Sequence, residues 1–181
     1  TQTTTFNKTR TDELILQDKD LDYRVLNFAS NTFNENHTAY WHKNVGGYHP
    51  AKLRRYQEMI ERHIAPQMQA AYREIAQANG RMDSVDASKF CILNMLNTKY
   101  FILPAGKQGE TVPVGNPYAY GNAWFVDRVC YVDNANEEIE KTGQVVPTET
   151  AVVDKRFREV LKGATELKKD SLAGIRLKEY A

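Results

Sequence analysis

The stretch "AYWHKNVGGYHPAKLRRYQEMIERH", residues 39–63, joins a loop of aromatic, basic and glycine residues to a segment with helical periodicity. Gly46 and Gly47 predict a backbone bend ahead of a helix. Pro50 suits the first turn of that helix, where its missing N–H costs little. One apolar face is predicted from residues that recur at three- and four-residue spacing, namely Leu53, Tyr56, Ile60 and Ile64.

The segments around this stretch alternate between strand-forming and helical patterns. Pro66 should end or kink the first helix, and a second helix should close at Gly80. Asn, Ser and Thr residues favour turns, so residues 30–40 are predicted to be a loop. The remaining elements expected in this half are a short helix or turn at 10–20, a strand at 22–29, a short helix at 86–97 capped by Asp86 or Ser88, and a strand at 99–104.

The second half of the chain opens with a long segment, "AGKQGETVPVGNPYAYGN", residues 105–122. Its glycines and prolines predict a loop that is either functional or mobile. Asn134 is the expected N-cap of the helix that comes later. The elements expected after the loop are a strand at 123–132, a helix at 134–143, a strand at 150–154, a helical turn at 155–163 and a strand at 173–180.

Strands separated by helices indicate a mixed α/β fold, because parallel neighbours need a crossover connection. We expect a small mixed sheet of about four to five strands flanked by three to four helices. The organisation predicted along the chain is an arm with a short helix at 1–21, a single domain at 22–165 and a C-terminal strand at 166–181.

The composition is ordinary for a globular domain of this size. The chain has 181 residues, a net charge of +1 and 41% hydrophobic residues, so bulk charge predicts no nucleic-acid partner. No run reaches the roughly 18 apolar residues that span a bilayer. Cys91 and Cys130 lie in apolar runs, which favours buried free thiols over a disulfide but leaves both open.

The histidines are the first candidates for metal ligands. His42 and His49 are seven positions apart, but no carboxylate or cysteine completes a ligand set at the usual spacing. No phosphate-binding glycine loop and no nucleophile elbow is present. We therefore predict no metal, no cofactor and no catalytic residue, and the domain by itself is not expected to be an enzyme.

The same loop carries the best candidates for binding. Its aromatic rings could stack on a sugar or could pack the loop onto the helix. The N–H groups that open the helix, beside Lys43, His49 and Lys52, would suit a small anion. The predicted binding residues are Tyr40, Trp41, His42, Lys43, Gly46, Gly47, Tyr48, His49, Lys52 and Trp124.

Several blocks, in order, resemble the large extracytoplasmic segment of the YfhO family of bacterial membrane proteins. The first is "DYRVLNFASNTFNENHTAYWHKNVGGYHPAKLRRYQEMI", where the family shows a "YRVLN" strand, a Y-x-H-K-x-x-G-G-Y-H loop and "AKLRRYQ". The later blocks are "ILNMLNTKYFI" (92–102), "NPYAYGNAWFV" (116–126) and "TAVVDKRF" (150–157). Together they span roughly residues 22 to 157.

The members of this family span the membrane several times and resemble transferases that use lipid-linked sugars. Some members are linked to glycosylation of cell-envelope polymers. The resemblance implies a non-catalytic domain on the extracytoplasmic side of the cell membrane, and "AGIRLKEYA" is similar to the opening of a following β-rich segment. The implied partners are the membrane-embedded part of the same polypeptide and a glycan or lipid-linked sugar. A purely structural or protein-interaction scaffold is the alternative. No residue matches the family's catalytic acidic motif, and an extracytoplasmic location would permit a Cys91–Cys130 disulfide.

Overall fold

A computed structural model describes residues 6–47, 53–168 and 170–179. Its contacts divide the chain into unit 1, Thr1–Ala119 with Glu179–Ala181, and unit 2, Tyr120–Lys178. The boundary between the units falls inside the range 22–165, for which the sequence predicts one domain.

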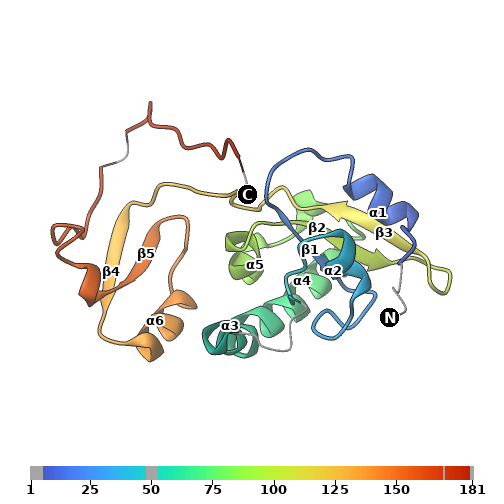
Figure 1. The fold of residues 1–181 in the computed structure, drawn as a ribbon, viewed down its shortest axis with the longest axis horizontal. Helices are drawn as coiled ribbons and strands as arrows, with labels where there is room; N and C mark the ends of the chain where they lie inside the picture. Colours follow the sequence, from blue (N-terminus) through green and yellow to red (C-terminus); the bar gives the residue numbers. More distant parts are fainter. Residues whose placement is uncertain (1–5, 48–52, 169, 180–181) are drawn as a thin grey trace, which may run out of the picture. The chain divides into compact units, whose positions relative to one another are not determined.

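Unit 1 is built on a three-stranded mixed sheet with the strand order β1-β2-β3 (Figure 1). Strands β1 (Arg24–Asn27) and β2 (Thr98–Pro104) are parallel, and β3 (Thr111–Gly115) returns antiparallel to β2. The chain crosses between the parallel strands through helices, as such a pair requires. At the other edge of β1, Val25 forms a parallel bridge with Asn44, which follows the helix α2 (His37–Trp41).

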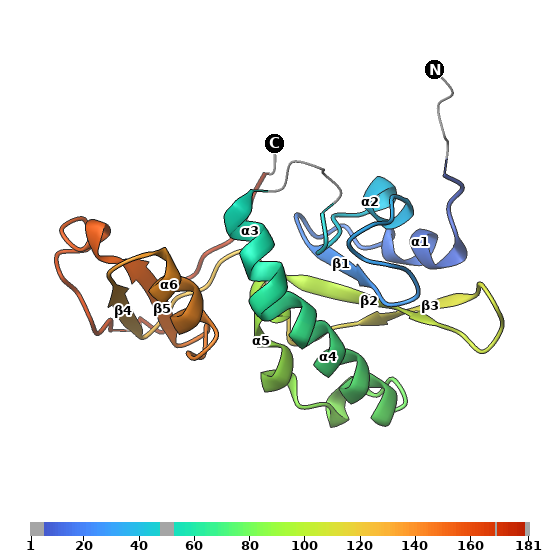
Figure 2. The same ribbon diagram turned by 90° about the horizontal axis from the view of Figure 1, so that it is seen from below.

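Helices cover both faces of this sheet, and Figure 2 shows α1 and α4 on opposite sides of its strands. Neighbouring strand residues point to opposite faces: Leu26 and Phe101 pack into one core cluster, and Val25 and Ile102 into another with Ile15. The elements are α1 (Arg10–Ile15), α3 (Arg54–Met59), a π-helical turn (Ile60–Ile64), α4 (Ala65–Gln77), 3₁₀ turns (Met82–Ser84 and Ala87–Phe90) and α5 (Cys91–Met95).

The sequence predicts that Pro66 ends or kinks the helix after the glycine loop; the helix does not end there, and the proline is preceded by a local change in helix type. Pro66 has no N–H to donate, and the turn before it takes the wider π form, in which the Ala65 N–H donates to the Ile60 carbonyl. Ile60 and Ile64 are buried as predicted. Leu53 is 80% exposed, because it precedes the first helical residue and does not join the apolar face.

The glycine pair makes the predicted bend, and each glycine has a separate reason. Gly47 has a φ of 59°, which favours glycine. Gly46 is packed so closely that a Cβ atom there would lie 2.1 Å from the Thr32 carbonyl oxygen. Asn44 reinforces this contact by donating its amide N–H to the same carbonyl at 3.0 Å.

Two predicted loops contain regular structure. Residues 30–40 include the start of α2, and residues 105–122 include β3. Strand β3 forms because Val112 and Val114 pair with Leu103 and Phe101 across the hairpin, which makes up for a proline at position 113. The strand predicted at 173–180 is absent from its described residues, 173–179.

Unit 2 holds the two-stranded parallel sheet of β4 (Arg128–Val132) and β5 (Thr150–Asp154). Helix α6 (Ala135–Thr142) connects the strands, and Asn134 caps it as predicted by accepting from the N–H groups of Asn136 and Glu137. A 3₁₀ turn follows at Lys155–Phe157.

The mixed α/β class is therefore confirmed; the described residues form five strands in two sheets, where the sequence suggested one sheet. Within the described ranges, every helix is too short or too polar to cross a membrane.

Candidate functional site

The aromatic residues of the predicted binding loop lie against the N-terminal arm. Tyr40 is 54% exposed, and its ring packs at 5.6 Å from Phe6 and 4.8 Å from Trp41, measured between centroids. The Lys8 ammonium lies 4.6 Å above the ring of Trp41, a cation–π distance. Tyr40 therefore remains available to a ligand, whereas Trp41 is half-buried by its neighbours.

The next predicted residues serve the fold. The His42 side chain is only 2% exposed and is bonded to Asp12, and Lys43 pairs with Asp22. Gly46 and Gly47 form the bend described above, with no open space beside Gly46. Tyr48, His49 and Lys52 lie outside the described residues, as does Pro50. Of the residues expected to form an anion site at the helix start, only Lys43 is described, and it forms an ion pair with Asp22.

Trp124 belongs to unit 2. Its indole N–H donates to the Pro147 carbonyl at 2.9 Å, and its ring packs edge-on against Tyr120 at 5.2 Å. The described contacts of Trp124 thus tie together the segments before β4 and before β5.

Asp12, in the first turn of α1, accepts hydrogen bonds at both of its carboxylate oxygens. Its Oδ2 accepts from the Thr9 N–H at 2.8 Å, the Thr9 hydroxyl at 2.7 Å and His37 Nε2 at 2.9 Å. Its Oδ1 accepts from His42 Nε2 at 2.9 Å. The bonds with Thr9 form a capping box, because the Thr9 hydroxyl oxygen also accepts from the Asp12 N–H. One carboxylate therefore joins α1 to both ends of α2.

This carboxylate is ionised although its side chain is only 2% exposed. Burial raises the pKa of Asp12, but the bonds from His37, Thr9 and His42 outweigh burial and lower the pKa to about 2. The two imidazoles differ in access: the His37 side chain is 31% exposed, whereas that of His42 is buried. Only His37 can meet a ligand.

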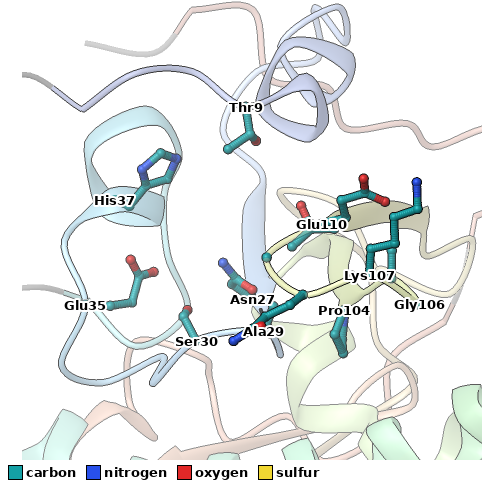
Figure 3. A pocket seen from close by; sticks show the side chains of 14 residues that line it. Thr9, Asn27, Ala29, Ser30, Glu35, His37, Pro104, Gly106, Lys107 and Glu110 are labelled. Carbon is teal, nitrogen blue, oxygen red and sulfur yellow. Dashed lines mark hydrogen bonds between the residues drawn. The ribbon is translucent and has the colours of Figure 1, made fainter.

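His37 lines a pocket of about 490 Å³ in unit 1. Figure 3 shows Glu35 and His37 on one side of this pocket and Lys107 and Glu110 on the other. The residues between these sides and above them are Asn27, Ala29, Ser30, Pro104 and Thr9. Strands β1 and β2 end at Asn27 and Pro104, so the pocket opens at the carboxyl ends of the two parallel strands. This is where open α/β sheets generally bind ligands.

The two walls of the pocket differ in how their side chains are held. The Asn27 amide donates to the Thr38 hydroxyl at 3.0 Å, and Glu35 accepts from the Thr38 N–H at 3.0 Å, which holds that wall to α2. On the opposite hairpin, Lys107 and Glu110 are exposed. The hairpin closes through the Glu110 N–H, which donates to the Lys107 carbonyl at 3.1 Å. One wall of the pocket is thus held by side-chain hydrogen bonds to α2, and the other presents exposed charged side chains.

Sequence reasoning missed this pocket. The spacing of Thr9 and Asp12 is that of a capping box and is readable in the sequence, but it reports a helix start and no ligand site. Nothing in the spacing of His37, Glu35 and Glu110 links them, because the pairing of β1 with β2 brings them together. Among the described residues, no group of three or more His, Cys, Asp or Glu could hold a metal ion. Cys91 and Cys130 carry free thiols.

Comparison with known proteins finds no matching family model, curated protein or solved structure.

Proposed function

We propose that this chain is a non-catalytic, glycan-binding domain on the extracytoplasmic side of a multi-spanning cell-envelope membrane protein. It would position a glycan or a lipid-linked sugar for the membrane-embedded part of the same polypeptide. The ordered sequence blocks that resemble the YfhO family support the setting. The observation that carries the binding function is the pocket at the carboxyl ends of β1 and β2, which is lined by polar and apolar groups together.

The chemistry of the pocket suits a polyhydroxylated ligand. Sugar hydroxyls both donate and accept, and the lining offers the hydroxyl of Ser30 and carboxylates from Glu35 and Glu110. Lys107 is the one lysine or arginine among the described residues that line the pocket, so the pocket has no excess of positive charge that would favour a polyanion.

An aromatic surface lies next to this polar lining. The Phe6 ring contacts both His37, at 5.7 Å, and Tyr40, at 5.6 Å, so the exposed face of Tyr40 is one ring away from the wall of the pocket. Flat aromatic faces bind the apolar faces of sugar rings while the polar groups hold the hydroxyls. Among the residues predicted to bind, Tyr40 is thus the one whose exposure and position beside the pocket best suit contact with a bound sugar.

The test is saturation-transfer NMR with methyl β-D-glucoside and a set of neutral and acidic oligosaccharides. Amide shifts on titration should concentrate in residues 27–37 and 104–111. Glu110→Gln should weaken binding about 3- to 10-fold, as expected when a hydrogen bond to a carboxylate is replaced by one to a neutral amide oxygen. Glu13→Gln, an exposed glutamate on α1 that does not line the pocket, is the matched control. No saturation transfer from any saccharide would refute glycan binding.

A scaffold is the second candidate, and a specific observation favours it. His42, Lys43 and Gly46, three of the residues predicted to bind, are all engaged in holding the loop to α1, to Asp22 and to Thr32. In a domain that only attaches to a partner, conspicuous polar and glycine residues would hold the fold together in this way and would bind no ligand. Binding of the isolated domain to the purified membrane part, together with an unchanged spectrum in every sugar titration, would support the scaffold.

A further inference from the structure

The two edges of the sheet in unit 2 differ. Along the edge of β4 that faces away from β5, the Val129 N–H donates to the Thr165 carbonyl at 2.9 Å. The Leu167 N–H donates to the Asp127 carbonyl at 2.7 Å, and an antiparallel bridge forms at the same place. The chain after the sheet therefore covers β4, whereas among the described residues β5 has β4 as its one neighbouring strand.

Alternate residues of β5 point their backbone groups away from β4. The Arg128 N–H donates to the Glu149 carbonyl at 2.9 Å, which sets the phase of the parallel ladder. In that phase, the N–H and C=O groups of Ala151 and Val153 also face β4. The residues whose backbone groups face outward are Thr150, Val152 and Asp154.

Most of these outward groups have no partner. The Thr150 N–H turns back to the Val146 carbonyl at 3.0 Å. Among the described residues outside the sheet, none bonds to the Thr150 C=O, the Val152 N–H and C=O or the Asp154 N–H. A row of unpaired backbone groups is a template for a further strand, and residues 150–154 contain neither the proline nor the lysine that often blocks such pairing.

Unit 2 also has little core of its own. Of its described residues, Val129, Val132 and Pro147 alone are buried, and none belongs to the two core clusters of the protein. All five residues of β5 are only partly buried. Parallel sheets are normally covered on both faces, and a sheet of two strands is marginally stable. A further strand on β5 would therefore complete a sheet that is small by itself.

The sequence of β5 is complementary to itself in the antiparallel direction. When two copies pair about a twofold axis at Val152, Thr150 of one copy lies opposite Asp154 of the other, and Ala151 lies opposite Val153. The two Val152 residues can exchange both of their free backbone hydrogen bonds, and each Asp154 N–H meets a free Thr150 carbonyl. The free groups of one copy are thus the ones that the other copy needs, and like charges do not lie opposite each other.

The charges just outside the paired segment are complementary as well. The same register brings Glu149 of one copy beside Lys155 of the other. Within one copy, both side chains are more than half exposed, and they pair with Arg128 at 3.3 Å and with Asp133 at 2.9 Å. Exposed ion pairs of this kind are weak, so each side chain can also contact the opposite charge across the twofold axis.

We propose that two copies of this chain associate through β5, by antiparallel pairing of their Thr150–Asp154 segments into one continuous sheet. A twofold contact uses the free edge of both copies and therefore stops at a dimer. A contact between two short strands buries little surface, so the association is weak and depends on concentration. The inference concerns unit 2 and does not depend on the proposed glycan binding.

The first experiment is sedimentation equilibrium of the whole chain over a dilution series, which should show reversible dimer formation. Val152→Pro removes the outward N–H but leaves the N–H groups that donate to β4, and proline is tolerated at such positions of edge strands. It should weaken association about 10- to 100-fold, the effect of losing the two central hydrogen bonds.

Amide hydrogen exchange on the same samples separates association from folding. The amides of Ala151 and Val153 should stay protected in wild type and in Val152→Pro, which shows that the ladder with β4 remains. In wild type, the Val152 amide should gain protection only as the concentration rises, because only the second copy can bond to it.

A pair of charge substitutions tests the register. Thr150→Lys should strengthen association and Thr150→Asp should weaken it, each by about 2- to 30-fold, because every dimer would contain two pairs with Asp154. Thr165→Lys and Thr165→Asp are the matched controls: Thr165 is exposed and bonds to the opposite edge of the sheet, so neither change should alter association.

Four outcomes would overturn the inference. One is a wild-type chain that stays monomeric at every concentration, and another is a dimer that Val152→Pro leaves unchanged, which would form through a different surface. A Val152 amide that is protected equally at every dilution would show that another part of the same chain covers this edge. Equal effects of Thr150→Lys and Thr150→Asp would refute the antiparallel register.

Discussion

Replacing Asp12 by Asn tests the hydrogen bonds that join α1 to α2. Asn has the same shape and no charge, so it stands in for the protonated acid. The folded protein lowers the pKa of Asp12 from 3.8 to about 2. A tenfold change in an acid's ionisation constant corresponds to about 1.4 kcal/mol, so the fold prefers the ionised form by about 2 kcal/mol. We expect Asp12→Asn to lower the free energy of unfolding by about this amount at pH 7.

The pH dependence gives this prediction its sign. A depressed folded pKa contributes stability that is present above the unfolded pKa, near 3.8, and is lost as the pH falls through the folded pKa, near 2. The difference between wild type and Asp12→Asn should therefore stay near 2 kcal/mol from pH 7 to about pH 4 and close toward pH 2.

The assay is urea unfolding followed by tryptophan fluorescence. The chain has two tryptophans, so Trp124→Phe in every sample leaves Trp41 as the reporter of unit 1. Glu13→Gln is the control: it removes a charge from the same helical turn, but at an exposed position, and should cost less than about 0.5 kcal/mol. A stability difference that is equally large at pH 7 and pH 2, or absent at pH 7, would refute the account of Asp12 as an ionised acceptor.

Two more predictions concern the glycine loop and the helix that follows it. Gly46→Ala places a methyl group 2.1 Å from the Thr32 carbonyl oxygen and should cost about 2–3 kcal/mol in thermal or urea unfolding, whereas Gly106→Ala, with nothing within 4 Å, should be near neutral. Tyr56→Phe removes the hydroxyl that donates to the buried Val45 carbonyl at 2.5 Å, and should cost about 1–2 kcal/mol with the same core packing. Equal stabilities for the two glycine variants, or a Tyr56→Phe protein as stable as wild type, would contradict these contacts.

The elements that sequence predicts well are those whose signals are local. Asn134 caps α6, and the spacing of Ile60 and Ile64 buries one helix face, because each depends on residues within a few positions. Strand β3 was missed because its glycine- and proline-rich surroundings indicate a loop, and only its pairing with β2 makes it a strand.

The candidate site depends even more on contacts between residues that are distant in the sequence. The loop residues were predicted to bind because of their chemical types, yet His42 is buried and Lys43 is paired, since a distant residue, Asp12 or Asp22, satisfies each of them. His37 stands out in the sequence only as one histidine among four, and its partner Asp12 lies 25 positions away. Proximity of this kind follows from the packing of α1 against the sheet, which no residue spacing reveals.

The π-helical turn before Pro66 has a consequence for how this helix must be aligned. Tyr56 and Ile75 both pack into the main core cluster, and they lie 19 positions apart. In a regular α-helix, that separation would rotate one residue about 100° from the other around the axis. One π turn holds an additional residue, which takes up about that rotation. The turn therefore acts as a single-residue insertion that keeps two halves of one helix in phase, and a related chain with one residue fewer between these positions could present the same face through an unbroken α-helix.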